Sequence, residues 1–237
     1  MHTIVSLDQR ALPGISGARL GDSGALAPGC RPQVHVVDDE EAVRVALHRL
    51  LATDDRYDVH THASAQSFLS SVDSNAPGCA ILDVAMPGVD GLEVQGMLLE
   101  RGCSLPIIFL TGCTDVRMCA SGMRRGAIDY LTKPVDDAVL FSTIERAVAL
   151  DAAQRAARSH HVMTQARLAS LTAREREVLT HVMSGRLNKQ IAGDLCIAEK
   201  TVKVHRARAM DKMRVRSVAE LVRMVERAGG AADPVRA

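Results

Sequence analysis

Five polar side chains that could do chemistry together follow short apolar runs of this sequence. Apolar runs that end at turn-forming residues predict buried β-strands. An acid pair follows the first run, a third acid follows the run CAIL, a hydroxyl follows the fourth run and a lysine the fifth: Asp38, Asp39, Asp83, Thr111 and Lys133. Because parallel strands end at one edge of a sheet, where open α/β folds bind ligands, we expect these five groups to converge.

The residue types at this edge are those that phosphoryl transfer requires. Three clustered carboxylates raise one another's pKa unless a hard cation holds them together, and Mg²⁺ fits because it takes oxygen ligands and keeps several waters. The hydroxyl of Thr111 and the ammonium of Lys133 suit phosphoryl oxygens. Asp83 lies on a central strand between the acid pair and Lys133, and is the predicted nucleophile that would form an aspartyl phosphate. Taken alone, each residue is an ordinary turn residue, cap or solvated charge.

The elements that must position these groups alternate between strand and helix patterns, which is typical of a parallel sheet built from βαβ units. We predict strands at residues 34–37, 57–61, 79–82, 107–110 and 128–131. We predict helices at residues 41–52, 64–72, 91–101, 114–125 and 137–150, with N-caps at Ser64 and Thr114. The fold class is therefore an α/β domain with a five-stranded, parallel, doubly wound sheet, followed by a smaller all-α domain.

Composition excludes several classes of protein. An apolar content of 47% is enough for two cores, whereas 2% aromatic residues and no Trp argue against stacking platforms for single-stranded nucleic acid. The six cysteines form no C-x-x-C pair and fit reduced residues of a cytoplasmic protein. No apolar stretch has the roughly 18 residues of a membrane span. Residues 1–32 are rich in Gly, Ser, Ala and Pro and predict a disordered N-terminal extension.

Charge divides the chain into two halves. Residues 171–237 carry 14 Lys and Arg against 8 Asp and Glu, a net charge of +6, while residues 1–170 carry 15 against 20, a net charge of −5. This asymmetry favours a polyanionic partner for the basic half, with an ordinary solvated surface as the alternative. Between the halves, residues 151–167 predict a helical linker, either continuous with the preceding helix or partly melted. His160 and His161 face different sides of such a helix and predict no metal site.

The basic half has a helix-turn-helix pattern. Thr172 and Glu175 form a capping box, Asn188 is expected to cap a short helix, residues 199–213 form a longer basic helix, and Ser217 with Glu220 begins a fourth. The second helix of such a pair enters the major groove. Lys203 is the candidate for base readout and Val204 for a thymine methyl, and phosphates are expected on five others: Lys189, Lys200, Thr201, Arg206 and Arg208. A basic coiled coil or solvated helix is the alternative.

Residues 33–150 resemble the receiver domain of two-component response regulators, a flavodoxin-like fold, through VVDDEE, LDVAMPG, IIFLTG and DYLTKP. The resemblance implies that Asp38 and Asp39 bind Mg²⁺, with Asp39 as the direct ligand, together with the phosphoacceptor Asp83 and the backbone carbonyl of Ala85. It further implies a switch pair and a phosphate-binding lysine with a cis bond to Pro134: Thr111, Tyr130 and Lys133.

Residues 168–237 resemble the four-helix LuxR-type DNA-binding domain through LTAREREVL and NKQIA, and the whole chain resembles the FixJ-like branch of response regulators. In that family the last helix forms the dimer contact, which would use Leu221, Val222 and Val225, although core packing explains these residues equally well. Two departures stand out. Ala207 replaces a polar or basic reader, and Cys113-Thr114 replaces a common His-Gly.

The resemblance implies a transcription regulator and not an enzyme. A histidine kinase would phosphorylate Asp83, and the protein would then dimerise on promoter DNA and contact RNA polymerase. Attraction between the acidic and basic halves could hold the unphosphorylated protein inactive. The alternatives are a DNA-binding scaffold that ignores phosphorylation and an aspartyl-phosphate hydrolase, which would need a second acid where Ala85 stands.

Overall fold

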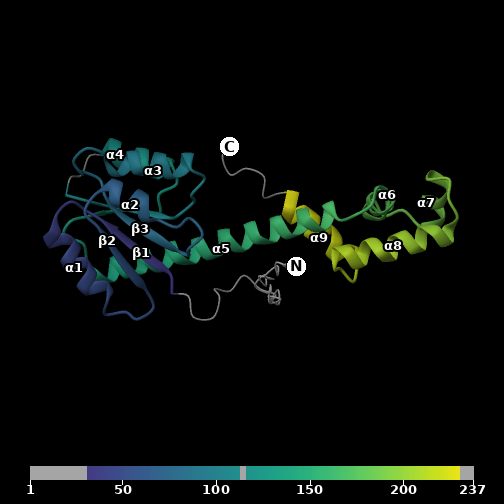
Figure 1. Ribbon diagram of the computed structural model, residues 1–237, viewed down its shortest axis with the longest axis horizontal. Helices are drawn as coiled ribbons and strands as arrows, with labels where there is room; N and C mark the ends of the chain where they lie inside the picture. Colours follow the sequence, from purple (N-terminus) through teal and green to yellow (C-terminus); the bar gives the residue numbers. More distant parts are fainter. Residues whose placement is uncertain (1–30, 113–115, 230–237) are drawn as a thin grey trace, which may run out of the picture.

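The computed structural model of the 237-residue chain describes residues 31–112 and 116–229. Two domains lie along one long helix, with the N-terminal domain at one end and the C-terminal domain at the other (Figure 1). Most of the predicted N-terminal extension lies outside the described residues, as do Cys113 and the predicted N-cap Thr114. Pro32, predicted to belong to the extension, is buried, and its carbonyl accepts a hydrogen bond from the Asp58 backbone.

The N-terminal domain is built on a parallel sheet with the strand order β2-β1-β3-β4-β5. The strands are β1 (Gln33–Val37), β2 (Asp58–His62), β3 (Gly78–Asp83), β4 (Ile107–Thr111) and β5 (Asp129–Thr132). The five predicted strands are therefore confirmed, each within one residue at either end. β3 and β4 are buried along their whole length, because helices cover both faces of the sheet. The predicted α/β fold class is confirmed.

Two apolar cores lie on the two faces of this sheet. On one face, α2 (Ala65–Ser71) and α3 (Gly91–Glu100) cover side chains that include Leu82 and Phe109. On the other face, α1 (Glu41–Leu51) and α5 (Asp137–Ala169) cover Ile81 and Ile108. The remaining helix, α4 (Val116–Arg124), follows β4. Ser64 caps α2 as predicted, since its side chain accepts from the backbone of Ser67.

The α5 helix continues without a break from Asp137 to Ala169, so the continuous-helix alternative for residues 151–167 is confirmed. Its 33 residues span about 50 Å at 1.5 Å per residue. Leu140, Ile144 and Ala147 are buried in the N-terminal core. Farther along, α5 packs against α8 and α9 of the C-terminal domain. One helix is thus shared by both domains.

The C-terminal domain consists of α6 (Ala173–Met183), α7 (Asn188–Asp194), α8 (Glu199–Met213) and α9 (Val218–Gly229). The predicted capping box is present, because Thr172 accepts from the Glu175 backbone and Glu175 accepts from the Thr172 backbone. Val178, Ile191 and Val202 pack together where α6, α7 and α8 meet. In the part of the chain that the structure describes, no helix is long and apolar enough to cross a membrane.

Two predicted caps differ in detail. The expectation that Asn188 caps α7 is wrong: Leu187 is the N-cap residue, and the Asn188 side chain instead accepts a hydrogen bond from Arg206 on α8. Ser217 does accept from the Glu220 backbone as predicted, but the Glu220 carboxylate reaches back to the Arg216 backbone. In both cases a side chain accepts a hydrogen bond from a donor other than the one that the local capping pattern predicts.

Three histidines lie on one face of the sheet, beside α2. His35 on β1 is register partner to His60 on β2, and His35 Nδ1 lies 3.1 Å from His62 Nε2. The ring of Phe68 packs against His35 and His62. Burial, and after it the neighbouring charges of His62 and His60, together lower the pKa of His35 to about 4. The fold therefore holds His35 neutral.

This cluster predicts acid sensitivity of the N-terminal domain. The unfolded chain binds a proton at His35 near pH 6.5 but the folded domain binds it only near pH 4, so stability is complete above pH 6.5 and falls as the pH drops to 4. The loss is about 3 kcal/mol. Urea unfolding of His35→Gln should show a weaker pH dependence across this range than wild type, whereas the exposed-site control His48→Gln should match wild type. An unchanged pH dependence in His35→Gln would assign the acid sensitivity elsewhere.

Candidate functional site

The three acids of the sequence prediction do converge. Asp38 and Asp39 follow β1, Asp83 ends the neighbouring strand β3, and one carboxylate oxygen of each lies within 4.8 Å of the others. Asp38 and Asp83 are buried, whereas Asp39 is exposed. The parallel register produces this arrangement, because both strands end at the same edge of the sheet.

Lys133 enters the cluster from the loop after β5. Its Nζ lies 2.6 Å from Asp38 Oδ2, 3.4 Å from Asp83 Oδ1 and 3.8 Å from Glu40 Oε1. Burial lowers the pKa of Lys133, but the hydrogen bond to Asp38 and the charges of Asp38 and Asp83 outweigh burial and raise it. The lysine is therefore held as an ammonium against two buried carboxylates. Its peptide bond to Pro134 is cis, as expected.

The cluster has more negative charge than Lys133 can balance. Asp83 Oδ1 is buried and accepts no hydrogen bond from any donor in the described part of the chain. Burial raises the pKa of Asp83, Lys133 opposes that rise, and the charge of Asp38 adds to it. A buried carboxylate oxygen that has an ammonium at 3.4 Å but accepts no hydrogen bond, beside two further carboxylates, belongs to a ligand set that a hard divalent cation fits. The residues present therefore suit Mg²⁺.

Backbone contacts fix the loop that carries the acid pair. Asp38 Oδ1 accepts from the Glu40 backbone at 2.9 Å, and Arg44 Nη1 donates to the backbone carbonyls of Asp38 and Asp39 at 2.8 and 2.9 Å. The sequence prediction missed Glu40 and Arg44. The only available signal was that Arg44 lies one turn into the helix that follows the acids, which by itself predicts a solvated side chain.

The other predicted residues also border this edge. Thr111 ends β4 and is buried, and its carbonyl accepts from the Lys133 backbone at 2.7 Å. Tyr130 is half-buried, and its ring centroid lies 5.6 Å from that of Phe109. Ala85 is exposed two residues beyond Asp83, and its backbone hydrogen bond to the Asp83 carboxyl lowers the pKa of Asp83. The structure thus brings the predicted acids, Thr111 and Lys133 to one edge of the sheet, whereas Tyr130 lies within β5 and packs on Phe109.

An open groove of about 780 Å³ adjoins the cluster. Glu40 and Lys133 are charged residues of its lining, and apolar side chains that include Pro134 and, on α1, Val43 and Leu50 line much of the rest. The groove therefore offers apolar surface beside the edge of the sheet where Lys133 meets the carboxylates.

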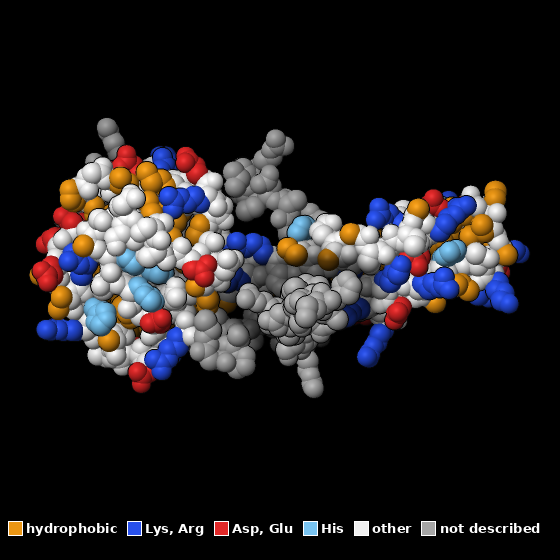
Figure 2. Space-filling model, in the orientation of Figure 1, with side chains coloured by type: hydrophobic (Ala, Val, Ile, Leu, Met, Phe, Trp, Pro, Cys, Tyr) orange, Lys and Arg blue, Asp and Glu red, His pale blue; other side chains and the backbone are white. Residues whose placement is uncertain are grey.

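The predicted DNA-contacting residues lie on and beside α8, and most of them are exposed: Lys189, Lys200, Thr201, Lys203, Val204 and Arg208. Figure 2 shows Lys and Arg side chains gathered over the end of the molecule that α6, α7 and α8 form. Val202 and Ala209 are fully buried on the opposite face of α8, which orients the basic face outward. Ala207, the departure from the family pattern, is exposed on that face.

Arg206 differs from the other predicted phosphate contacts. It is half-buried, and its Nη1 donates to Asn188 Oδ1 at 3.0 Å. This bond joins the first residue of α7 to the middle of α8, so it braces the two helices of the helix-turn-helix. The sequence prediction missed Asn188 as a partner, because the two residues lie 18 positions apart and no local pattern links them.

The last helix packs within the chain. Leu221 is fully buried, and Val225 packs against the same cluster, which includes Leu171 and Met213. Val222 is half-buried. The core-packing alternative therefore accounts for Leu221 and Val225.

Comparison with known proteins agrees with this geometry. A family model described as response regulator receiver domain matches residues 34–145, and one described as bacterial regulatory proteins, luxR family, matches residues 169–225. The response regulator protein TodT of Pseudomonas putida is 41% identical over 82% of this chain and 85% of its own length. The transcriptional regulatory protein FixJ of Rhizobium meliloti is 41% identical over 81% of this chain and 93% of its own.

Solved structures show the same likeness. The response regulator StyR is 42% identical and superposes with a TM-score of 0.77 over 83% of this chain and 99% of its own. Full-length FixJ from B. japonicum is 35% identical and superposes with a TM-score of 0.53 over 85% of this chain and 98% of its own. The chain belongs to the response regulators of two-component systems. Within them it is a transcriptional regulator with a LuxR-type DNA-binding domain.

Gly91 is predicted to control the position of Asp83. A Cβ atom at Gly91, the first residue of α3, would lie 2.4 Å from the Asp83 carbonyl oxygen, too close for any side chain. Gly91→Ala should therefore destabilise the receiver by about 1–3 kcal/mol, the range for overpacking. Chemical denaturation measures this change.

Gly96 supplies the control within the same helix. Among the residues that the structure describes, its Cβ would meet only Arg125 Nη1, at 3.8 Å, so Gly96→Ala should stabilise the receiver by about 0.5–1 kcal/mol through helix propensity. If Gly91→Ala behaved like Gly96→Ala, the close approach of Gly91 to Asp83 would not constrain the acceptor strand.

Proposed function

We propose that Asp83 accepts a phosphoryl group from the phosphohistidine of a histidine kinase. The observation that carries this proposal is the convergence of three carboxylates and Lys133 at the carboxyl edge of the sheet. An oxygen of Asp83 attacks phosphorus, the phosphorus–nitrogen bond of phosphohistidine breaks, and the imidazole leaves as the neutral base after taking up a proton. Mg²⁺ held by Asp38, Asp39, Asp83 and the Ala85 carbonyl would neutralise charge on the transferring group. Lys133 would hold a second phosphoryl oxygen.

The new charge on Asp83 is proposed to act through Thr111 and Tyr130. The Thr111 hydroxyl would donate to the phosphoryl group, and Tyr130, which packs on Phe109, would follow into the space that Thr111 leaves. This change alters the face formed by α4, β5 and α5, through which two copies would form a homodimer. The groove beside α1 is the surface where we place the kinase.

We propose that α8 recognises promoter DNA through the major groove, and that the protein acts in the cytoplasm. Lys203 reads base edges and Val204 contacts a thymine methyl, while Lys189, Lys200, Thr201 and Arg208 hold phosphates. Arg206 acts chiefly through Asn188, as a brace that keeps α7 and α8 in register. RNA polymerase is the further partner that a promoter-bound regulator would contact.

The hydrolase alternative receives no support from the residues near Asp83. A phosphatase needs a group that activates water, and the position two residues beyond Asp83 is occupied by Ala85, whose methyl group cannot do so. We therefore propose a regulator and not an enzyme. Experiment distinguishes the proposed switch from the scaffold alternative, in which phosphorylation of the receiver does not change DNA binding.

The first test is selection of DNA duplexes from a random library by the full-length protein, with and without beryllofluoride as the phosphoryl mimic. Enrichment of paired half-sites should require both beryllofluoride and Mg²⁺, because the mimic binds the Asp83 carboxylate through the proposed site. The Asp83→Ala variant should not respond. Equal enrichment in every sample would contradict the proposed switch and favour the scaffold alternative.

Lys203 and Lys200 should differ in what they contribute to DNA binding. Lys203→Ala should cost about 1–3 kcal/mol on the selected duplex and relax the preference at one base position. Lys200→Ala should weaken binding to all sequences alike and reduce the slope of log affinity against log salt by about 1. Titrations at several salt concentrations measure both effects, with the exposed Arg174→Ala on α6 as control. A uniform loss in Lys203→Ala would make Lys203 a phosphate contact instead.

A further inference from the structure

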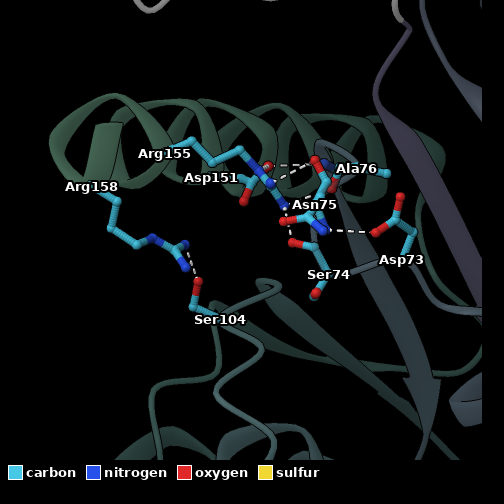
Figure 3. A network of polar contacts seen from close by, with 9 residues as sticks. Asp73, Ser74, Asn75, Ala76, Ser104, Asp151, Arg155 and Arg158 are labelled. Atoms are coloured by element: carbon cyan, nitrogen blue, oxygen red, sulfur yellow. Dashed lines mark hydrogen bonds and ion pairs between the residues drawn. The ribbon is translucent and has the colours of Figure 1, made fainter. Parts of the chain in front are cut away.

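The receiver contacts α5 beyond the part of this helix that packs in the receiver's apolar core. Asp151 is 1% exposed, and its Oδ2 accepts from the Gly78 backbone at 2.9 Å and from Arg155 Nε at 2.7 Å. The rest of the Arg155 guanidinium donates to three successive carbonyls of the loop before β3, at 3.2 Å to Ser74, 2.9 Å to Asn75 and 2.6 Å to Ala76 (Figure 3). We call Asp151 and Arg155 with their backbone partners the α5 clamp.

The clamp is built for a fixed geometry. A Cβ at Gly78 would lie 1.9 Å from the Gln33 carbonyl oxygen, so only glycine lets β3 begin this close to β1 while its N–H faces Asp151. The planar guanidinium of Arg155 directs its donors in a rigid fork, and each bond is charge-assisted. One turn farther along α5, Arg158 donates to Ser104 in the loop before β4 (Figure 3). These contacts lie at the amino ends of the strands, opposite Asp83.

The DNA-binding domain contacts the same helix about one turn beyond Arg158. His161 Nδ1 lies 2.8 Å from the Ala228 carbonyl on α9, and Arg167 Nη1 donates to the Met213 carbonyl at the end of α8. Leu168 packs against the cluster of Leu171 and Leu221. Among the described residues, the hydrogen bond of Arg158 to the receiver and that of His161 to the DNA-binding domain are separated on α5 by Ser159 and His160, which are both exposed. Residues 151–158 therefore include contacts with the receiver, residues 161–167 include contacts with the DNA-binding domain, and the segment between them is two residues long.

We propose that α5 is a rigid coupling whose helical phase sets the orientation of the DNA-binding domain, and that Asp151 and Arg155 are positioning residues that fix this phase. Each residue of an α-helix adds a rotation of 100°, so contacts on both sides of Ser159 define one rotation between the domains. A dimer on two half-sites must present both α8 helices to grooves about one DNA turn apart, which makes that rotation matter. The proposal rests on the phosphorylation-dependent DNA binding proposed above.

Insertions after Ser159 test the phase without touching either set of contacts. Two alanines rotate the DNA-binding domain by about 200° and lengthen α5 by about 3 Å, whereas seven rotate it to within about 20° of its original phase and lengthen α5 by about 10 Å. The measurement is affinity for a duplex selected by the wild-type protein, with and without beryllofluoride. We expect the seven-residue variant to keep the beryllofluoride response and the two-residue variant to lose it. Equal behaviour of the two variants, retained or lost, overturns the proposal.

The clamp is tested by Arg155→Gln in the full-length protein. Small-angle scattering of this variant should show a broader distribution of interdomain distances than wild type, and its beryllofluoride response should weaken. Thermal unfolding establishes that the receiver remains folded, and Gln165→Ala, an exposed change on the same helix, is the matched control. A variant that matches wild type in both scattering and response shows that Arg155 positions nothing. If the variant does not fold, the insertion pair still decides the question.

The two proposals fail in different ways. A wild-type protein that ignores beryllofluoride contradicts the proposed function, while scattering of wild type and Arg155→Gln still tests the rigid coupling. A wild-type protein that responds, together with insertion variants that behave alike, contradicts the coupling alone.

Discussion

Two buried carboxylates on neighbouring strands share one lysine, and this imbalance of charge organises the receiver. Lys133 Nζ contacts both Asp38 and Asp83, while Asp83 Oδ1 accepts no hydrogen bond in the described part of the chain. A site with one cation for two buried anions, and a third acid at its rim, has an excess of negative charge that a further cation would balance. The sheet must hold these groups against their repulsion, which it does by burying β3 and β4 completely and by fixing the acid loop through Arg44.

The burial of these strands explains how much of the receiver could be predicted from the sequence. Apolar strands buried on both faces appear as continuous apolar runs, and an acid at the end of such a run stands out because it interrupts the run at the edge of the sheet. The strands and the convergence of Asp38, Asp39, Asp83, Thr111 and Lys133 followed from this local signal. The family motifs added roles for Tyr130 and Ala85 that no spacing rule supplies.

Most of the contacts that were not predicted join residues far apart in the sequence, and the contacts of Arg44 with the acid loop are a local exception. Asp151 and Arg155 stand in an Ala- and Arg-rich stretch whose propensity predicts a helix but says nothing of the carbonyls at 74–76 that Arg155 collects. The bond between Asn188 and Arg206, and the pairing of His35 with His62, have the same character. Helix propensity alone could not decide between a melted and a continuous linker, because the deciding contacts are tertiary.

In this structure, charge attraction does not hold the basic domain against the acidic receiver. Four of its cations pair with acids of the same domain: Lys212 with Glu175, Lys203 with Glu199, Arg174 with Glu177 and Arg186 with Asp194. Lys200, Lys203 and Arg208 on the outward face of α8 are exposed, so the acidic receiver does not cover them. An inhibited state held by docking of receiver acids on α8 would have to break or sharply bend the continuous α5, at the cost of the contacts on both sides of Ser159. Control of DNA binding through the relative orientation of two copies requires no such break. The same helix that keeps α8 away from the receiver would transmit any change in how two receivers pair to the DNA-binding domains.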